Sequence, residues 1–150
     1  METEEIKKLR KLNKELIENG CNNFFISGIS KGLLDDVFCL NKQNGTWIIF
    51  YTERGKNEDP IYLTNDLDEV INYYKNYIMK IDHWHLIIST RSYEKIIEYK
   101  KVLEKSNIKT IENNIPAYKS KNDYVYRLFV LNKSIFEAKK IFDNIPYNDL

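Results

Sequence analysis

Hydrophobic residues recur every three or four positions in two stretches of the first half of the chain, with charged and amide residues between them. This spacing predicts two amphipathic helices, at residues 6–17 and 67–81, each burying one stripe of side chains. Asn65 and Asp66 are good N-caps and lie just before the second stretch. We therefore expect that helix to begin at one of these two residues.

Between these helices, aromatic and β-branched residues gather in runs that are typical of strands. The pair Asn44-Gly45 separates two of the runs and predicts a tight hairpin, because both residues tolerate positive φ. In the next run, Trp47, Ile49 and Tyr51 share one face and the other face is also apolar, which predicts a central strand. The expected strands are 23–29, 36–42, 46–53 and a short edge strand at 61–64, with a charged loop at 54–60.

The second half of the chain predicts elements in the order strand, helix, strand, strand, helix. Tyr93, Ile96 and Ile97 are among the residues expected to face the core from the first of these helices. Ser134 and Glu137 have the spacing of a capping box, which predicts that Ser134 caps the second helix. The expected elements are 84–89, 91–105, 109–115, 124–131 and 134–145, with a polar loop at 116–123.

These elements predict an α+β protein made of two fused parts. Residues 1–81 should form an antiparallel sheet with flanking helices, and residues 82–150 a ferredoxin-like β-α-β-β-α half. The boundary near residues 80–83 has no linker rich in Gly, Pro or Ser. We therefore expect one compact body of two subdomains.

Opposite charges nearly balance over the whole chain, with 23 Lys and Arg against 22 Asp and Glu. General nucleic-acid binding needs a basic excess that releases counterions, so this balance predicts no nucleic-acid partner. The halves differ, because residues 1–80 hold 11 basic against 13 acidic residues and residues 81–150 hold 12 against 9. The chain has no apolar run near the roughly 18 residues of a membrane span and no signal-peptide core, which predicts a cytoplasmic protein without a membrane partner.

The residues that could carry catalysis or bind a metal are few. His83 and His85 would share one face of a strand, and Cys21 or Cys39 could complete a metal site, but the chain has no paired metal-ligand spacing. An enzyme, for instance a small nuclease, could use His85 as its acid or base. No nucleophile, phosphate-loop or dinucleotide motif supports catalysis, so we expect no enzyme activity, no metal and no cofactor.

Charged residues instead gather in the loops of the first half, around the end of its central strand. Such charges are often no more than a solvated strand end. Alternatively, these loops present charges to a protein partner, and the acidic ones could imitate a nucleic acid in the cleft of that partner. The candidate partner-binding residues are Asp35, Asp36, Tyr51, Glu53, Arg54, Glu58 and Asp59.

The run from Trp47 to Gly55 has the ending Tyr51-Thr52-Glu53-Arg54-Gly55, and it is followed by Leu63, Glu69, Val70 and the aromatic pair Tyr73-Tyr74. With these residues, the first half resembles the small immunity proteins of bacterial polymorphic toxin systems, such as those of contact-dependent inhibition. The resemblance covers roughly residues 5–80. It implies a noncatalytic protein whose partner is the C-terminal domain of a cognate toxin, held inactive by direct stoichiometric binding.

Residues 84–145 are similar in pattern to small ferredoxin-like domains described as signal-transducing proteins, with Leu128 to Leu131 as the last strand before a helix that holds Ala138. This second resemblance implies a regulatory module that binds a small ligand or a protein partner. The edge strand expected at 61–64 could pair with a second copy of the chain, so a homodimer also stays open.

Overall fold

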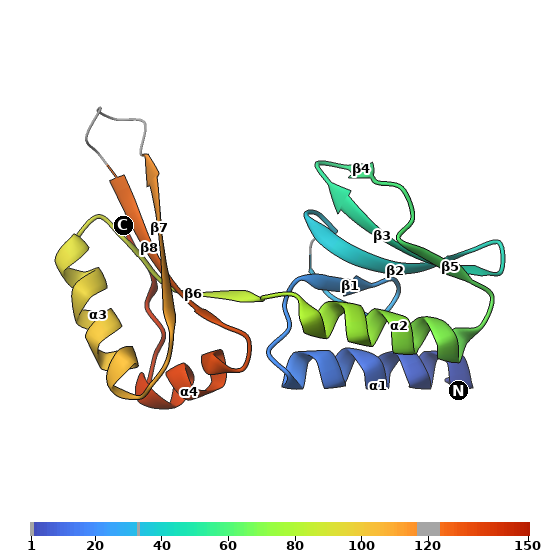
Figure 1. Ribbon diagram of the computed structural model, residues 1–150, viewed down its shortest axis with the longest axis horizontal. Coiled ribbons are helices and arrows are strands. Elements are labelled where there is room, and N and C mark those ends of the chain that lie inside the picture. Colours follow the sequence, from blue (N-terminus) through green and yellow to red (C-terminus); the bar gives the residue numbers. More distant parts are fainter. Residues whose placement is uncertain (1, 33, 117–123) are drawn as a thin grey trace. The chain divides into compact units, whose positions relative to one another are not determined.

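The computed structural model describes residues 2–32, 34–116 and 124–150, and it divides the chain into two compact units (Figure 1). The first unit is Met1–Asp82 and the second is His83–Leu150. The division lies one residue from the predicted boundary between residues 81 and 82. Both units combine helices with a sheet, which confirms the α+β class.

In the first unit, two helices lie together on one face of a five-stranded sheet (Figure 1). The strand order is β1-β2-β3-β4, and β5 also pairs with β3, so β3 is the central strand that the sequence predicted. The helices and strands of this unit are α1 (Glu4–Glu18), β1 (Phe24–Ile26), β2 (Val37–Gln43), β3 (Thr46–Glu53), β4 (Lys56–Asn57), β5 (Tyr62–Thr64) and α2 (Leu67–Lys80).

The prediction that this sheet is antiparallel was wrong, because the sheet is mixed. β1 pairs with β2 in parallel, with Phe24 opposite Phe38 and Ile26 opposite Leu40. A strand of three residues is only about 10 Å long. The chain therefore needs no crossover helix to return from the end of β1 to the beginning of a parallel neighbour. The hydrophobic pattern indicates that a strand exists but carries no information about its direction.

The core of the first unit joins the predicted helix stripes to one face of the sheet. Tyr74 of α2 lies at its centre, where its hydroxyl donates to the Phe38 carbonyl at 2.6 Å and accepts from the Phe25 N–H at 3.1 Å. Burial raises the pKa of Tyr74, so the phenol stays neutral and ties α2 to β1 and β2. The buried core residues are Leu9, Leu12, Leu16, Cys21, Ile26, Leu40, Trp47, Ile49, Val70, Tyr74 and Ile78.

The second unit has a four-stranded sheet with the strand order β7-β8-β6-β9 and both helices packed on one face (Figure 1). The predicted order β-α-β-β-α is confirmed, and β9 adds a strand that the sequence did not predict. β9 runs parallel to β6. The short α4 therefore connects β8 to β9 at one end of the sheet, and the connection does not run back along the length of the sheet. The elements are β6 (Trp84–Thr90), α3 (Tyr93–Lys105), β7 (Thr110–Pro116), β8 (Tyr124–Leu131), α4 (Ser134–Ile141) and β9 (Tyr147–Asp149).

Two predictions about side chains of the second unit were wrong. Tyr93 and Ile97 are exposed, because α3 buries a narrower stripe that contains Ile96 and Leu103. Ser134 is the first helical residue of α4 and makes no capping hydrogen bond, since Lys133 already has helical φ and ψ. Of the predicted loop 116–123, residue 116 ends β7 and the rest lies outside the described residues.

Candidate partner-binding surface

The turn between β3 and β4 lies at the centre of the predicted binding residues. Arg54 and Gly55 are its two central residues, with φ of 51° and 77°, and Glu53 and Lys56 form the last pair before it. Positive φ at both central positions makes this a type I′ hairpin turn. The backbone N–H of Arg54 donates to Oδ1 of Asp35 at 2.6 Å, which fastens the turn to the segment before β2.

Carboxylates of the turn region and of the segment before β2 raise the pKa of one phenol, that of Tyr51. The pKa of Tyr51 is raised by burial first, and then by the negative charges of four carboxylates. The Glu58 N–H also donates to the Tyr51 carbonyl at 2.8 Å, which holds Glu58 beside β3. In order of decreasing effect on the pKa of Tyr51, the four carboxylates are those of Asp36, Glu53, Glu58 and Asp35.

The structure therefore brings together six of the seven residues that the sequence predicted. We call this region the acidic hairpin surface; it carries four carboxylates against two basic side chains. Tyr51 is half-buried in it, whereas the charged side chains are exposed. Asp59 is exposed as well, but it is not among the carboxylates with the largest effect on the pKa of Tyr51. The acidic hairpin surface consists of Asp35, Asp36, Tyr51, Glu53, Arg54, Lys56 and Glu58, and a shallow hollow lies among Glu53, Arg54, Lys56 and Glu58.

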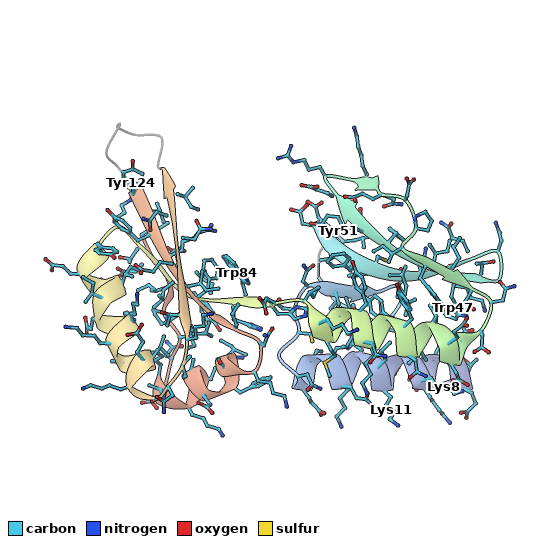
Figure 2. All side chains as sticks on the ribbon, in the orientation of Figure 1. Lys8, Lys11, Trp47, Tyr51, Trp84 and Tyr124 are labelled. Atoms are coloured by element: carbon cyan, nitrogen blue, oxygen red, sulfur yellow. The ribbon has the colours of Figure 1, made fainter. Side chains whose placement is uncertain are left out.

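Aromatic rings continue from Tyr51 (labelled in Figure 2) along the margin between the sheet and α2. The ring of Tyr51 lies 4.8 Å from that of Phe38, which lies 5.2 Å from Tyr77. Tyr77 lies 6.3 Å from Tyr73, and Tyr73 stacks on Tyr62 at 3.9 Å. We call these five rings the aromatic row; Tyr73 is exposed and the other four are half-buried.

Carboxylates also affect the other end of the aromatic row, at Tyr62. The pKa of Tyr62 is raised by burial and by Glu69, whose carboxylate pairs with the Thr64 hydroxyl. The sequence placed Tyr73 and Tyr77 at the edge of a helix stripe but missed their connection to Tyr51. That connection depends on the register of β2 and β3, which sets Phe38 opposite Tyr51.

The residues considered for catalysis or metal binding are divided between the two units. In the second unit, His83 is buried just before β6, and His85 is half-buried on β6. Cys21 and Cys39 are buried in the first unit, where burial raises the pKa of both thiols. Within residues 2–32, 34–116 and 124–150, no cluster of three or more His, Cys, Asp or Glu side chains is arranged to hold a metal ion.

Comparisons with protein-family models, with curated proteins and with solved structures found no match to this chain. Among the described parts of the chain, no helix has both the length and the apolar character that a membrane crossing requires.

Proposed function

We propose that this chain is an immunity protein that neutralises the C-terminal domain of a cognate bacterial toxin by direct one-to-one binding in the cytoplasm. The observation that carries the proposal is the acidic hairpin surface. Six residues chosen from the sequence as a contact surface lie around a single turn, although segments 35–36 and 51–58 are separate in the chain. They include Tyr51, Glu53 and Arg54 of the ending that resembles immunity proteins.

The aromatic row supplies the apolar part of such a contact. A stable protein interface buries about 1,600 Å² in total, and a few aromatic and Arg side chains contribute most of its binding energy. Tyr73 is the most exposed ring of the row, and Arg54 lies at the tip of the neighbouring turn. We expect these two side chains to act as anchors, since Tyr and Arg are enriched among residues of this kind.

The carboxylates at both ends of the row have a different role in the proposal. Glu53 and Glu58 at one end and Glu69 at the other favour a partner whose surface is basic. A basic surface of this kind is typical of proteins that cleave or bind nucleic acids. Long-range attraction would mainly raise the association rate, while the rings would determine how slowly the complex dissociates.

Co-expression with the toxin domain encoded beside this gene tests the proposal. We expect the chain to restore growth and to copurify with the toxin domain at one to one. Tyr73→Ala should weaken the complex by about 2 kcal/mol or more, the cost typical of an interface hot spot, and should reduce protection.

A matched control is Tyr124→Ala, since Tyr124 lies in the second unit and its exposed fraction of 41% is close to the 37% of Tyr73. This control should protect as well as the wild type. Growth arrest despite soluble wild-type protein, or equal loss of protection in both variants, contradicts the proposal.

A further inference from the structure

The second unit has one sheet edge that is much longer than the others. Among the described residues, the other strands at sheet edges (β1, β4, β5 and β9) have two or three residues each, whereas β7 pairs with β8 in continuous register over seven. Natural proteins protect sheet edges with short strands, bulges or Lys side chains. β7 has none of these protections, and its one charged residue, Glu112, is paired with Lys100 of α3 at 3.1 Å. This edge therefore offers backbone N–H and C=O groups to another strand.

Exposed apolar side chains flank this edge on the helix side of the sheet. Tyr93 and Lys100 of α3 both interact with Glu112, the first through a hydrogen bond that raises the pKa of its phenol. This side of α3 therefore lies toward β7. Ile97 lies on it too, because residues three and four apart share one side of a helix. Tyr93 is 45% exposed and Ile97 is 40% exposed. The sequence pattern predicted both as core residues, and a second chain that covers them would account for that pattern.

Apolar side chains also flank the edge on the face without helices. Glu112 lies opposite Leu128, which is buried in the cluster that contains helix residues, so Glu112 is on the helix side. Side chains alternate along a strand, which places Ile111, Asn113 and Ile115 on the other face. Ile115 is 38% exposed and Ile111 is half-buried. The edge thus has apolar neighbours on both faces of the sheet.

The residues of β7 are complementary to themselves when two copies of the strand run antiparallel. With Asn113 opposite Asn113 of the second copy, Ile111 lies opposite Ile115, and Glu112 lies opposite Asn114. Apolar residues then pair across the strands on one face, and no two carboxylates are opposite each other. A register centred on Glu112 would set two carboxylates opposite each other, so the register centred on Asn113 is favoured.

We propose that the chain forms a symmetric dimer in which β7 pairs with β7 of a second copy and the two sheets become one. Antiparallel pairing of identical strands places a two-fold axis perpendicular to the sheet, at Asn113, and keeps the helices of both copies on one side. Tyr93 and Ile97 then flank the pairing on that side. A strand edge about 23 Å long and 5 Å wide is far smaller than the roughly 800 Å² that each partner buries in a standard interface, so these side chains are needed as well.

This dimer differs from the one that the sequence left open at residues 61–64. The strand there, β5, has only three residues, and its exposed apolar side chain is Leu63. The proposed dimer is also separate from the proposed immunity function, because it uses residues of the second unit and the acidic hairpin surface belongs to the first. Variants at the β7 edge should therefore protect against the toxin like the wild type, so failure here is distinguishable from failure of the immunity proposal.

Sedimentation of the full chain over a range of concentrations, without toxin, measures the dimer. We expect a monomer–dimer equilibrium in the micromolar range. Ile97→Lys should weaken it by about tenfold or more, because it replaces an apolar contact beside the pairing with a charge on each copy. The matched control is Val102→Lys, since Val102 is 37% exposed on the same helix. Val102 shares the side of α3 that carries Lys95, which binds Asp149 of β9 at the other edge of the sheet. This control should dimerise like the wild type.

Lysine at two neighbouring positions of β7 tests the register. Asn113→Lys sets two lysines opposite each other at the axis and should weaken the dimer. Asn114→Lys adds the same charge to the same strand but sets it opposite Glu112 of the second copy, so the dimer should not be weakened.

Cysteine at the same two positions tests the register without relying on affinity. Asn113→Cys should give a disulfide-linked dimer on mild oxidation, because Cα atoms of an antiparallel pair, about 4.5–5.5 Å apart, are within reach of a disulfide. Asn114→Cys should not, since diagonal neighbours lie about 7–8 Å apart. The wild type controls for Cys21 and Cys39, which are buried.

Four results would overturn the inference. The first is a wild-type chain that stays monomeric at every concentration. The second is equal dimerisation of Ile97→Lys and Val102→Lys. The third is a dimer that Leu63→Lys abolishes and Ile97→Lys does not, since the edge at residues 61–64 would then be the one that pairs. The fourth is loss of protection by Ile97→Lys, since the toxin domain and not a second copy would then cover the β7 edge.

Discussion

The hairpin turns at the two ends of β3 have the same backbone geometry but different residues. Asn44 and Gly45 lead into the strand with φ of 51° and 81°, and Arg54 and Gly55 lead out of it with φ of 51° and 77°. Both turns have two central residues and belong to type I′. The first turn and its flanking pair are uncharged, whereas the second turn carries three charges in four residues.

Asn is a favoured residue at the first central position of such a turn, and Arg is not. A residue other than Gly in the left-handed region costs about 1–2 kcal/mol, less for Asn because its side chain bonds locally. At Arg54 the cost is offset in part by the hydrogen bond from its N–H to Asp35. The turn that departs from local preference is the one in the candidate site, as expected where a side chain is kept for binding.

The largest effect should come from the glycines and should be equal at the two turns. A Cβ placed on Gly45 or Gly55 meets no atom within 4 Å, so alanine there costs only backbone strain. Gly45→Ala and Gly55→Ala should each lower the free energy of unfolding of the first unit by about 1–2 kcal/mol. Denaturation in a Trp84→Phe background, where the buried Trp47 is the remaining tryptophan, measures this.

A much larger loss at one glycine than at the other would show that the two turns are not equivalent.

Exchanging the first central residues should have smaller effects of opposite sign. Arg54→Asn should raise the free energy of unfolding by about 0.5–1 kcal/mol, and Asn44→Arg should lower it by about as much. Arg54→Asn should nevertheless bind the toxin domain less well, because it removes the guanidinium. The same denaturation assay and a binding titration separate the two effects.

Destabilisation by Arg54→Asn would mean that Arg54 is kept for folding, and would remove the reason to assign it to the interface.

The charge difference between the ends of β3 should also appear in the titration of Tyr51. Burial and the nearby carboxylates raise the pKa of Tyr51 above its unfolded value of about 10. The neutral phenol is thus favoured in the folded state. Its contribution to stability is complete below the unfolded pKa and is lost as the pH rises through the folded pKa.

Glu58→Gln should lower the pKa of Tyr51, and Asp59→Asn should leave it nearly unchanged. Absorbance titrations compared with those of Tyr51→Phe isolate this phenol from the other tyrosines. Equal shifts in the two variants would place Asp59 in the acidic hairpin surface after all.

The sequence predicts those structural features that depend on neighbouring residues, and it misses those that depend on distant ones. The turn at Asn44-Gly45 and the bounds of β3 were predicted, because turn chemistry and the alternation of side chains along a strand depend only on neighbouring residues. The turn at Arg54-Gly55 was predicted only as a loop, because Arg does not indicate a type I′ turn. The parallel β1, like the exposed positions of Tyr93 and Ile97, depends on which distant elements pack together.

The candidate site was predicted in its residues but not in its arrangement. Loop position and charge were enough to select Asp35, Glu53 and Glu58. Their approach to Tyr51 follows from the pairing of Val37 with Thr52, which no local pattern fixes. The same holds for the aromatic row, whose members come from β2, β3, β5 and α2.

The most direct test of the central claim is the association rate with the toxin domain at low and high salt. Glu58→Lys changes the charge by +2 in the acidic hairpin surface. Gln43→Lys combined with Thr46→Lys makes the same change at the other end of β3. Charge reversal at Glu58 should slow association by about tenfold at low salt, with the difference fading at high salt, while the control pair should have little effect. Equal rates for Glu58→Lys and the wild type at low salt would contradict the assignment of this surface to the toxin interface.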